Sequence, residues 1–234
     1  MIRVQPLAAT VLVTLGVALV GVLAFAQLTH GFSALTSETA RRDAVAAVPI
    51  ELPVLTGIDQ AGRRHALFDD IDQAGSAPRV TIVDFIYTRC VGVCSALGGS
   101  YQQLQAAIQA RHLEDRVRLV TVSFDPQHDT PSTLARYAQQ MHADPRIWTL
   151  MSPQHAEQLP GLLGSFGIVV VPAPLDQFQH NAAFHVLDGR GRLARIVDLN
   201  DAQGALDAAL SLLPAAPSSP RAGARASTSA SALT

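Results

Sequence analysis

The chain is poor in cysteine. Cys90 and Cys94 are the only two thiols among 234 residues, and only three residues separate them. With no third thiol available, the two either bond to each other or act together on something else. A structural disulfide closing so short a ring would constrain the unfolded chain only weakly, because the entropy that a disulfide removes grows with loop length. The pair therefore favours chemistry, either disulfide exchange or binding of a soft metal ion.

The sequence also lacks several features that would place it in other functional classes. Its formal net charge is −2 and no block of basic residues stands out, which argues against nucleic acid as a partner. No G-x-S-x-G, phosphate-binding loop, H-E-x-x-H or dinucleotide fingerprint is present. No hydrolase, nucleotide-binding or zinc-protease motif therefore competes with the cysteine pair.

Charged side chains are missing from residues 7–28, which are mostly Ala, Val and Leu. A helix needs about 20 such residues to cross a bilayer. Arg3 precedes the run, so the positive-inside rule places the N-terminus in the cytoplasm and the rest outside. A cleaved signal peptide is the alternative, since Ala24-Phe25-Ala26 fits a cleavage site, but the apolar core of such peptides is usually only about 7–15 residues long. We expect residues 1–28 to form a single-pass anchor in the inner (cytoplasmic) membrane, with the body in the periplasm.

Composition divides the rest of the chain into three parts. Residues 29–49 are small, polar and rich in alanine, and are expected to be a linker. Residues 214–234 contain mainly Pro, Ala, Ser, Thr, Gly and Arg, so they cannot bury enough apolar surface to order themselves, and we expect a disordered tail. Residues 50–213 are long enough for one domain with a sizeable core.

Within this domain, strand-like apolar runs alternate with patterns of apolar residues spaced every three to four positions, which are typical of helices. Thr130 followed by Pro131 fits a helix N-cap with proline at the first helical position, and Ser152 followed by Pro153 shows the same pattern. The predicted strands are 80–87, 116–124, 147–150, 183–187 and 193–197, the predicted helices are 94–112, 131–141, 153–166 and 201–213, and residues 167–181 are expected to be rich in loops.

The alternation of strands and helices predicts a partly parallel sheet covered by helices on both faces. The last two strands are joined by Asp188-Gly-Arg-Gly191, a tight hairpin that adds an antiparallel edge. The fold class is therefore α/β, with a thioredoxin-like layout that carries one additional βα unit, preceded by the N-terminal transmembrane helix.

The two cysteines lie where the first predicted strand of this layout meets its helix. If Cys94 starts the helix, its thiol lies near the positive end of the helix dipole, where thiolates are favoured. Thioredoxin-type oxidoreductases use C-x-x-C. Here one additional residue widens the loop and lets the sulfurs stand apart, which suits a metal ion. Thiolates select Cu(I), with zinc as the alternative.

Two thiolates usually require a further donor, and the sequence offers eight histidines. His180 is the strongest candidate, because it lies just before the final hairpin, where a thioredoxin-like fold returns beside the cysteine loop. His185 alternates with apolar residues and is expected on a strand face, whereas the other histidines, His128 included, are expected to be solvent-exposed. Asp125 ends the second strand and is expected to face the same crevice, although turn and cap chemistry also explains it.

Three motifs in this order resemble the Sco/SenC family of thioredoxin-fold copper chaperones. The first is Phe85-Ile-Tyr-Thr-Arg-Cys90-Val-Gly-Val-Cys94, the second is Asp125-Pro-Gln-His-Asp129-Thr-Pro, and the third is His180 before a strand that ends in Asp188-Gly-Arg-Gly191. The likeness spans about residues 50–213. Val91, Gly92 and Ser95 stand where the family usually has proline, an acid or amide, and a second proline, so the chain is a divergent relative.

The resemblance implies a copper site formed by Cys90, Cys94 and His180, with Asp125 nearby, that holds Cu(I) and also Cu(II). It further implies a membrane-tethered metallochaperone, not a turnover enzyme, that delivers copper to a recipient protein, the subunit of cytochrome c oxidase that carries the dinuclear copper centre. Some family members act mainly as thiol-disulfide reductants. In that alternative Cys90 attacks a partner disulfide, Cys94 resolves the intermediate, and His180 tunes the thiolates without binding metal.

Overall fold

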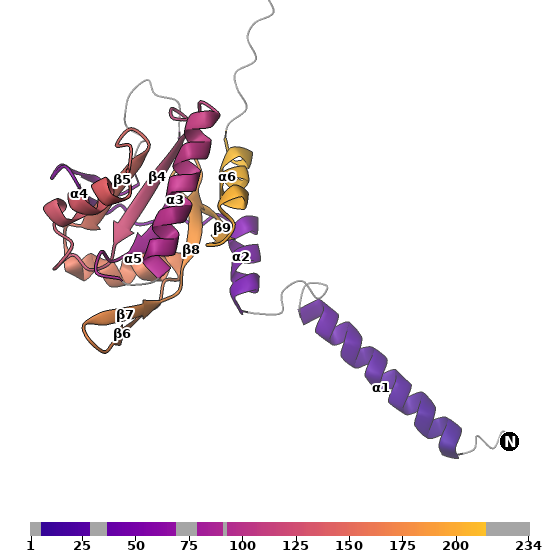
Figure 1. Ribbon diagram of the computed structural model, residues 1–234. Helices are drawn as coiled ribbons and strands as arrows, with labels where there is room; N and C mark the ends of the chain where they lie inside the picture. The colour runs from indigo at the N-terminus through magenta and orange to yellow at the C-terminus, as the bar shows by residue number, and fades with distance from the viewer. Residues whose placement is uncertain (1–5, 29–36, 69–78, 91–92, 214–234) are drawn as a thin grey trace, which may run out of the picture.

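The computed structural model describes residues 6–28, 37–68, 79–90 and 93–213. Its centre is a seven-stranded sheet in the order β2-β1-β5-β4-β3-β8-β9 (Figure 1). The three middle strands, β5, β4 and β3, run parallel, and the strands on either side are antiparallel. The strands are β1 (Thr56–Asp59), β2 (Arg64–Ala66), β3 (Val80–Ile86), β4 (Val117–Ser123), β5 (Trp148–Pro153), β8 (Ala183–Leu187) and β9 (Leu193–Asp198).

Helices cover both faces of this sheet. On one face, α3 (Val93–Ala110) lies beside α4 (Pro131–Gln140) and α6 (Ala202–Ser211), and Tyr101 of α3 packs on Trp148 and Phe184 of the strands. On the other face, Phe166 of α5 (Leu159–Phe166) packs on Phe85 of β3. All seven residues of β3 are buried, as expected of a central parallel strand covered on both faces. The α/β fold predicted from the sequence is confirmed.

The predicted cap at Thr130-Pro131 is confirmed, and α6 has a side-chain cap that was not predicted from the sequence. The side chain of Thr130 accepts a hydrogen bond from the backbone N–H of Thr133 (3.3 Å), with Pro131 in the first turn of α4. Asp201 accepts from the N–H of Gly204 (2.8 Å) at the start of α6. Both side chains satisfy N–H groups that have no partner within their own helix.

The same cap signal is misleading at Ser152-Pro153. These two residues end β5, where they pair with Ile58 and Gly57 of β1. The 3₁₀ helix η1 (Ala156–Gln158) and then α5 follow. Pairing with β1 extends β5 beyond the predicted Leu150, and this tertiary contact outweighs the local preference for a helix start.

The span predicted to be rich in loops contains a hairpin. Strands β6 (Val170–Ala173) and β7 (Gln177–His180) pair only with each other and form a separate two-stranded sheet, which projects from the body in Figure 1. Pro172 and Pro174 hide the strand signal, because proline is depleted in strands. This hairpin positions His180.

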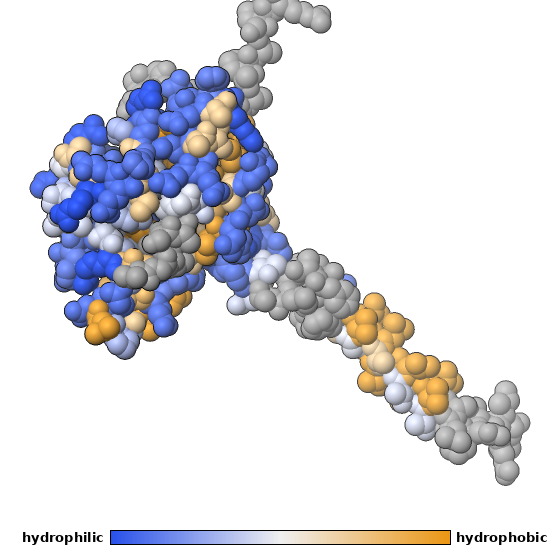
Figure 2. All heavy atoms as spheres, in the orientation of Figure 1, coloured by the Kyte–Doolittle hydropathy of each residue, from blue (hydrophilic) through white to orange (hydrophobic). Residues whose placement is uncertain are grey.

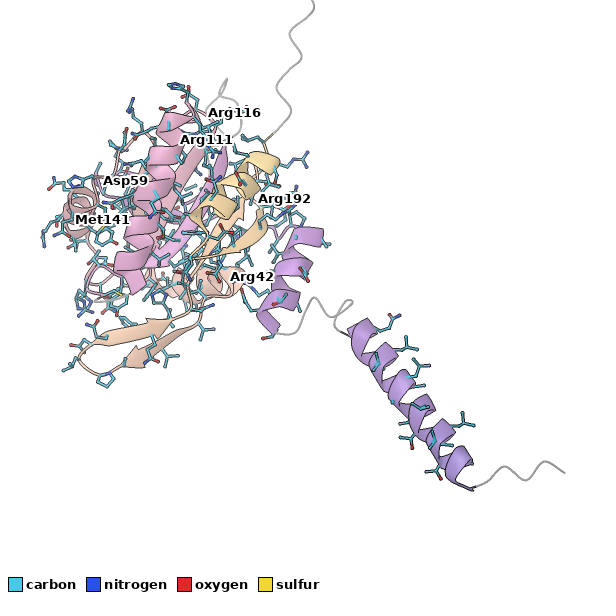
Figure 3. The ribbon with its side chains drawn as sticks, turned by 45° about the vertical axis from the view of Figure 1, so that its right-hand side comes forward. Arg42, Asp59, Arg111, Arg116, Met141 and Arg192 are labelled. Carbon is cyan, nitrogen blue, oxygen red and sulfur yellow. The ribbon has the colours of Figure 1, made fainter. Side chains whose placement is uncertain are left out.

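The segment predicted as a linker contains α2 (Ser37–Ala47), which lies along β9. Val45 is buried, and Arg42, labelled in Figure 3, approaches Asp198 of β9 (4.0 Å). The sequence prediction missed this packing because α2 buries only one large apolar side chain, too few to give an amphipathic pattern.

The N-terminal helix α1 (Pro6–Leu28) stands away from the body (Figure 1). Within the described ranges, no helix combines the length and hydropathy needed to cross a membrane. The predicted transmembrane helix is therefore not confirmed. The predicted tail at 214–234 and positions Val91 and Gly92 lie outside the described residues.

Candidate metal and thiol site

Cys90 lies just beyond the carboxyl end of β3, where the chain turns toward α3. Its backbone N–H donates to the carbonyl of Tyr87 (3.2 Å), which closes a tight turn, and its side chain is half-buried. Cys94 lies in the first turn of α3, as predicted, although its side chain is outside the described part of the chain. The start of a helix favours a thiolate.

The turn that carries Cys90 is tied to the end of β4 by a buried carboxylate. Asp129 is only 1% exposed and accepts hydrogen bonds from the backbone N–H of Thr88 (3.0 Å), the hydroxyl of Thr88 (2.5 Å) and the hydroxyl of Ser123 (2.5 Å). Three donors satisfy a carboxylate that would otherwise be costly to bury. Asp129 therefore holds the residues before Cys90 in place, a role that the sequence analysis did not assign.

Asp125 ends up where the sequence predicted, at the carboxyl end of β4, but its carboxylate is already engaged. It accepts hydrogen bonds from the Arg89 guanidinium (2.9 Å) and from Nδ1 of His128 (2.8 Å). Burial alone would raise the pKa of Asp125, yet these two partners outweigh burial and hold that pKa below its usual range. Asp125 thus contacts Arg89, the neighbour of Cys90. His128 is exposed, as expected, and its ring is also held by this carboxylate.

His180 ends β7, and its ring lies against two aromatic side chains that directly follow β3 and β4 of the main sheet. The ring centroid is 5.0 Å from that of Phe124 and 6.3 Å from that of Tyr87. Its Nδ1 donates to the carbonyl of Asn181 (3.0 Å), so Nε2 is the unprotonated nitrogen of the neutral ring. Burial lowers the pKa of His180, and the bond to Asn181 offsets part of that shift. The imidazole is therefore neutral near pH 7, the form that binds metal ions.

An aromatic cluster of Tyr87, Phe124 and Phe178 connects the hairpin to the main sheet. The three ring centroids are 5.2 to 5.8 Å apart. The hydroxyl of Tyr87 also accepts from the backbone N–H of Phe178 (3.1 Å) and donates to the side-chain oxygen of Gln177 (3.0 Å). Since Tyr87 is three residues before Cys90, the cluster brings His180 to the same end of the sheet as Cys90 and Asp125.

These contacts bring a thiol donor, from Cys90, and an imidazole donor, from His180, to the same end of the sheet. They do not complete a set of metal ligands. Among the residues whose side chains the structure describes, no group of three or more His, Cys, Asp or Glu could hold a metal ion. The predicted set depends on Cys94, whose side chain is not among them. The assignment of Cys90, Cys94 and His180 as ligands stays a prediction.

His185 lies on a strand face, as expected, and that face is buried in the core. It is 1% exposed and packs edge-on against Phe85 (5.8 Å) and Phe166 (5.2 Å), on the sheet face that α5 covers. Burial lowers its pKa to about 3, so the ring is neutral at all ordinary pH values. His185 is five residues from His180 but belongs to the core.

Arg89, His128 and Asp129 are site residues that reasoning from the sequence missed. The motif Asp125-Pro-Gln-His128-Asp129 is visible in the sequence, but it reads equally well as turn and cap chemistry. Only the pairing of β3 with β4 shows that this turn faces the cysteine loop, since Ile86 lies opposite Ser123.

Known proteins share this architecture. The SCO1 protein homolog of Bacillus subtilis (strain 168) is 26% identical over 118 residues, a match that covers 50% of this chain and 60% of that protein. Among solved structures, a SCO1/SenC family lipoprotein from Bacillus anthracis str. Ames superposes with a TM-score of 0.62 at 22% identity, and covers 70% of this chain and 97% of its own.

Two further solved structures have the same fold. Bradyrhizobium japonicum ScoI with copper bound has a TM-score of 0.56 at 20% identity, over 69% of this chain and 98% of its own. BsSco, described as a member of the Sco family of cytochrome c oxidase assembly proteins with a disulfide switch, has a TM-score of 0.56 at 21% identity, over 70% and 95%. The family model described as SCO1/SenC matches residues 60–213. The chain thus belongs to the SCO1/SenC family.

Proposed function

We propose that this protein binds copper through Cys90, Cys94 and His180 and delivers it to the dinuclear copper centre of cytochrome c oxidase. Two thiolates and one imidazole form a soft donor set suited to Cu(I). A site with so few ligands at the edge of the fold permits handover, because an acceptor can add its own donors before those of this chain leave. The protein acts as a metallochaperone and not as a turnover enzyme.

The observation that carries this proposal is the placement of His180. The hairpin β6–β7 holds a neutral imidazole against Tyr87 and Phe124, at the end of the sheet from which the cysteine loop leaves. Its Nδ1 donates a hydrogen bond to a backbone carbonyl. In metal-binding histidines such a hydrogen bond commonly fixes the ring so that the other nitrogen faces the ion. The copper bound to Bradyrhizobium japonicum ScoI and the oxidase-assembly role ascribed to BsSco support the same reading.

We place the domain outside the cytoplasmic membrane and attached to it by the N-terminal segment. Residues 7–28 contain no charged side chain, and the Bacillus anthracis relative is described as a lipoprotein. Membrane fractionation with an alkaline wash tests the attachment, and protease digestion of spheroplasts tests the side. Release of the protein by the wash, or protection in spheroplasts, contradicts this part of the proposal.

A thiol-disulfide reductase is the second candidate, and the position of Cys94 in the first turn of α3 is the observation that favours it. The start of a helix favours a thiolate, the form of cysteine that exchanges disulfides. In this function the Cys90 thiolate attacks a partner disulfide and Cys94 then displaces the partner. The two cysteines are oxidised to a disulfide while the partner gains two thiols, so an external reductant must restore them.

An anaerobic Cu(I) competition titration of the reduced protein separates the two functions. We expect one tight equivalent for the wild type and a loss of at least about tenfold in affinity for His180→Ala, since removing a ligand or its immediate support costs on that order. Cys90→Ser is expected to lose more. His155→Ala is the matched control, because His155 is half-exposed and its nearest charged partner is Glu157. Binding that ignores both His180 and Cys90 rules out the copper site and leaves disulfide exchange.

A further inference from the structure

Within the described residues, the β6–β7 hairpin, which carries His180, pairs with no strand of the main sheet. Figure 2 shows the hairpin at the edge of the body, with no other element lying over it in this view. Val170 pairs with His180 in the last rung of the hairpin, so the imidazole lies at the base of the hairpin and not at its turn. The contacts at this base therefore decide where the imidazole stands.

The side chain of Asn181, the residue after His180, bridges the two chain segments that meet at the base. Its Nδ2 donates a hydrogen bond to the carbonyl of Gly167 (2.9 Å), and its Oδ1 accepts one from the backbone N–H of Val169 (2.7 Å). Gly167 and Val169 lead into β6, whereas Asn181 follows β7. The amide of Asn181 thus ties the entry of the hairpin to its exit.

The backbone of the same residue orients the imidazole. The carbonyl of Asn181 accepts the hydrogen bond from Nδ1 of His180 (3.0 Å). Because the side chain of Asn181 is bonded at both of its polar atoms, the position of this carbonyl is fixed, and the orientation of the His180 ring is fixed with it. Asn181 therefore acts on the ring through one peptide group and needs no contact with a bound ion.

The segment to which Asn181 bonds is itself held by another helix. Gly167 follows α5 in the left-handed conformation (φ +64°), and the guanidinium of Arg41 in α2 donates to the carbonyl of Phe166. A Cβ atom on residue 167 would lie 2.5 Å from this guanidinium, so both the backbone conformation and the close approach require glycine. Arg41 anchors the end of α5, and the amide of Asn181 joins the hairpin to that anchored segment.

Asparagine matches its two partners atom by atom. The carbonyl of Gly167 needs a donor and the N–H of Val169 needs an acceptor, and an amide presents one of each. An ionised aspartate has no donor, and leucine has neither group. Asn181 is exposed to solvent, so its two short hydrogen bonds, and not burial, distinguish it from other polar residues of the surface.

We propose that Asn181 is the residue that positions His180 for copper: its amide closes the base of the β6–β7 hairpin, and its carbonyl fixes the orientation of the ring. This inference rests on the proposed function, because it assigns how one donor of the copper site is held. Groups that hold a metal-binding histidine from behind commonly change metal affinity by tenfold or more when they are lost. Removing the amide should therefore weaken copper binding although no donor atom is lost.

The test is a thermodynamic cycle on the full-length reduced protein, titrated anaerobically with Cu(I) against a chromophoric chelator. Asn181→Leu has nearly the same size but makes neither hydrogen bond. We expect it to bind Cu(I) about fivefold more weakly than the wild type, less than the usual effect of losing such support because the carbonyl remains. Asn181→Leu combined with His180→Ala should bind no more weakly than His180→Ala alone, because a residue that acts through the ring has no effect once the ring is gone.

Asn181→Asp is a milder variant that removes one bond. It keeps the acceptor for the N–H of Val169 and loses the donor to the carbonyl of Gly167. Its Cu(I) affinity should lie between those of the wild type and Asn181→Leu. The added carboxylate attracts a cation, so weaker binding in this variant reflects the lost hydrogen bond and not the new charge.

Gln105→Leu is the matched control. The amide of Gln105 in α3 makes the same pair of backbone bonds, since it accepts from the N–H of Asp144 (2.7 Å) and donates to the carbonyl of His142 (3.0 Å). Gln105 follows Cys94 in α3 by about 16 Å of helix, so the loop that it holds lies far from the proposed donors. Gln105→Leu should lose a similar amount of stability in urea and bind Cu(I) like the wild type.

A second measurement reports on the ring without copper. NMR of the copper-free protein labelled with 15N-histidine distinguishes which ring nitrogen carries the proton. We expect the proton of neutral His180 on Nδ1 in the wild type and in Gln105→Leu, because the carbonyl of Asn181 accepts from it. Asn181→Leu should show a mixture of the two tautomers.

The outcomes separate this inference from the proposed function. Wild-type affinity in Asn181→Leu, or an unchanged Nδ1–H tautomer, overturns the positioning role and leaves the copper site intact. Equal losses of affinity in Asn181→Leu and Gln105→Leu overturn it too, because affinity then follows stability, as does a further loss in the double variant. If the wild type binds no Cu(I), or His180→Ala binds it normally, the proposed function fails and the positioning role falls with it.

Discussion

The two hairpins of this protein, β8–β9 and β6–β7, differ in how deeply they are buried and in which strands they pair with. All five residues of β8 are buried, and β8 pairs with β3 on one side and β9 on the other. No residue of β6 or β7 is fully buried, and the two strands pair only with each other. The first hairpin is part of the core, and the second depends on a few aromatic contacts with Tyr87 and Phe124.

The turns differ in the same way. In β8–β9 the carboxylate of Asp188 accepts hydrogen bonds from the backbone N–H groups of Arg190 (2.9 Å) and Arg192 (3.0 Å), and Gly191 supplies the left-handed position with φ +76°. In β6–β7 the left-handed positions are occupied by Leu175 and Asp176. In the β8–β9 turn the left-handed position is a glycine, so the backbone is unstrained. In the β6–β7 turn the left-handed positions carry side chains, so the backbone is strained, and one of these side chains is an exposed leucine. The difference indicates that β8–β9 serves stability and β6–β7 serves the site.

The largest test of this contrast replaces one phenylalanine in each hairpin. Phe184 of β8 is fully buried against Tyr101, so Phe184→Ala should lower the free energy of unfolding by about 3–5 kcal/mol. Phe178 of β7 is only partly buried, and Phe178→Ala should cost roughly 1–2 kcal/mol, because much of that surface already meets water. Urea unfolding monitored by tryptophan fluorescence measures both.

Copper binding should rank the same two variants in the opposite order. Phe178 belongs to the aromatic cluster that places His180, so Phe178→Ala should weaken Cu(I) binding, whereas folded Phe184→Ala should bind normally. If the two variants lose Cu(I) affinity in proportion to their loss of stability, the division of roles between the hairpins is wrong.

The contrast also explains how far the sequence could predict the fold. Residues 183–187 and 193–197 show apolar runs on either side of Asp188-Gly-Arg-Gly191, and the structure confirms that hairpin. The β6–β7 hairpin was missed because Pro172 and Pro174 suggest a loop. Its pairing depends on contacts with Tyr87, more than 80 positions away, and local propensity cannot report such contacts.

The site was predictable to a similar extent. Asp125 could be placed at the correct end of the sheet because the carboxyl ends of neighbouring parallel strands meet. His180 could be placed there because it precedes β8, which runs antiparallel to β3 and therefore begins at the end where β3 finishes. The partners Arg89 and Asp129 could not, since which side chain a carboxylate contacts depends on the register of β3 against β4. The identity of the metal ligands stays a prediction, because it requires the Cys94 side chain.

The second test compares the histidines of the two hairpins by pH. His185 has a pKa of about 3 in the folded state, mainly because of burial and secondarily because Arg41 lies near it, against about 6.5 when unfolded. The folded state therefore excludes a proton that the unfolded state binds. Stability is full above about pH 6.5 and declines as the pH falls toward 3.

At pH 5 the difference between the folded and unfolded pKa values of His185 lowers the free energy of unfolding by about 2 kcal/mol. We expect the free energy of unfolding to fall less between pH 7 and pH 5 in His185→Leu than in the wild type, by this amount. His180→Ala should change that fall little. Urea unfolding at pH 7 and at pH 5 measures both. Parallel pH dependences in the wild type and His185→Leu contradict a neutral buried His185.

The third test exchanges the turn chemistry. Gly191→Ala places a Cβ atom at φ +76° and should destabilise the protein by about 1 kcal/mol. Leu175→Gly relieves the same conformation at φ +62° and should be neutral or stabilising by up to about 1 kcal/mol. Thermal unfolding at pH 7 compares them. A loss of stability in Leu175→Gly means that the leucine contributes to folding and that the β6–β7 turn is not strained.

The smallest and most specific test is the loss of one oxygen atom, Tyr87→Phe. The ring stays in the aromatic cluster, but the backbone N–H of Phe178 loses its acceptor and Gln177 loses its donor, a cost of about 1 kcal/mol. If the hydroxyl fixes the hairpin, His180 becomes less well positioned, and Cu(I) should dissociate about threefold faster in a chelator competition followed by stopped flow, as expected when a group that orients a ligand is removed.

Tyr101→Phe is the matched control for this last test. Its hydroxyl donates to the carbonyl of Ile82 (3.0 Å) in the core, so its removal should cost a similar amount of stability without touching the hairpin. Faster dissociation in Tyr87→Phe alone shows that the hairpin is held in place for His180. Equal dissociation rates in the two variants mean that the aromatic contacts with Phe124 suffice, and the hydroxyl then serves only the local fold.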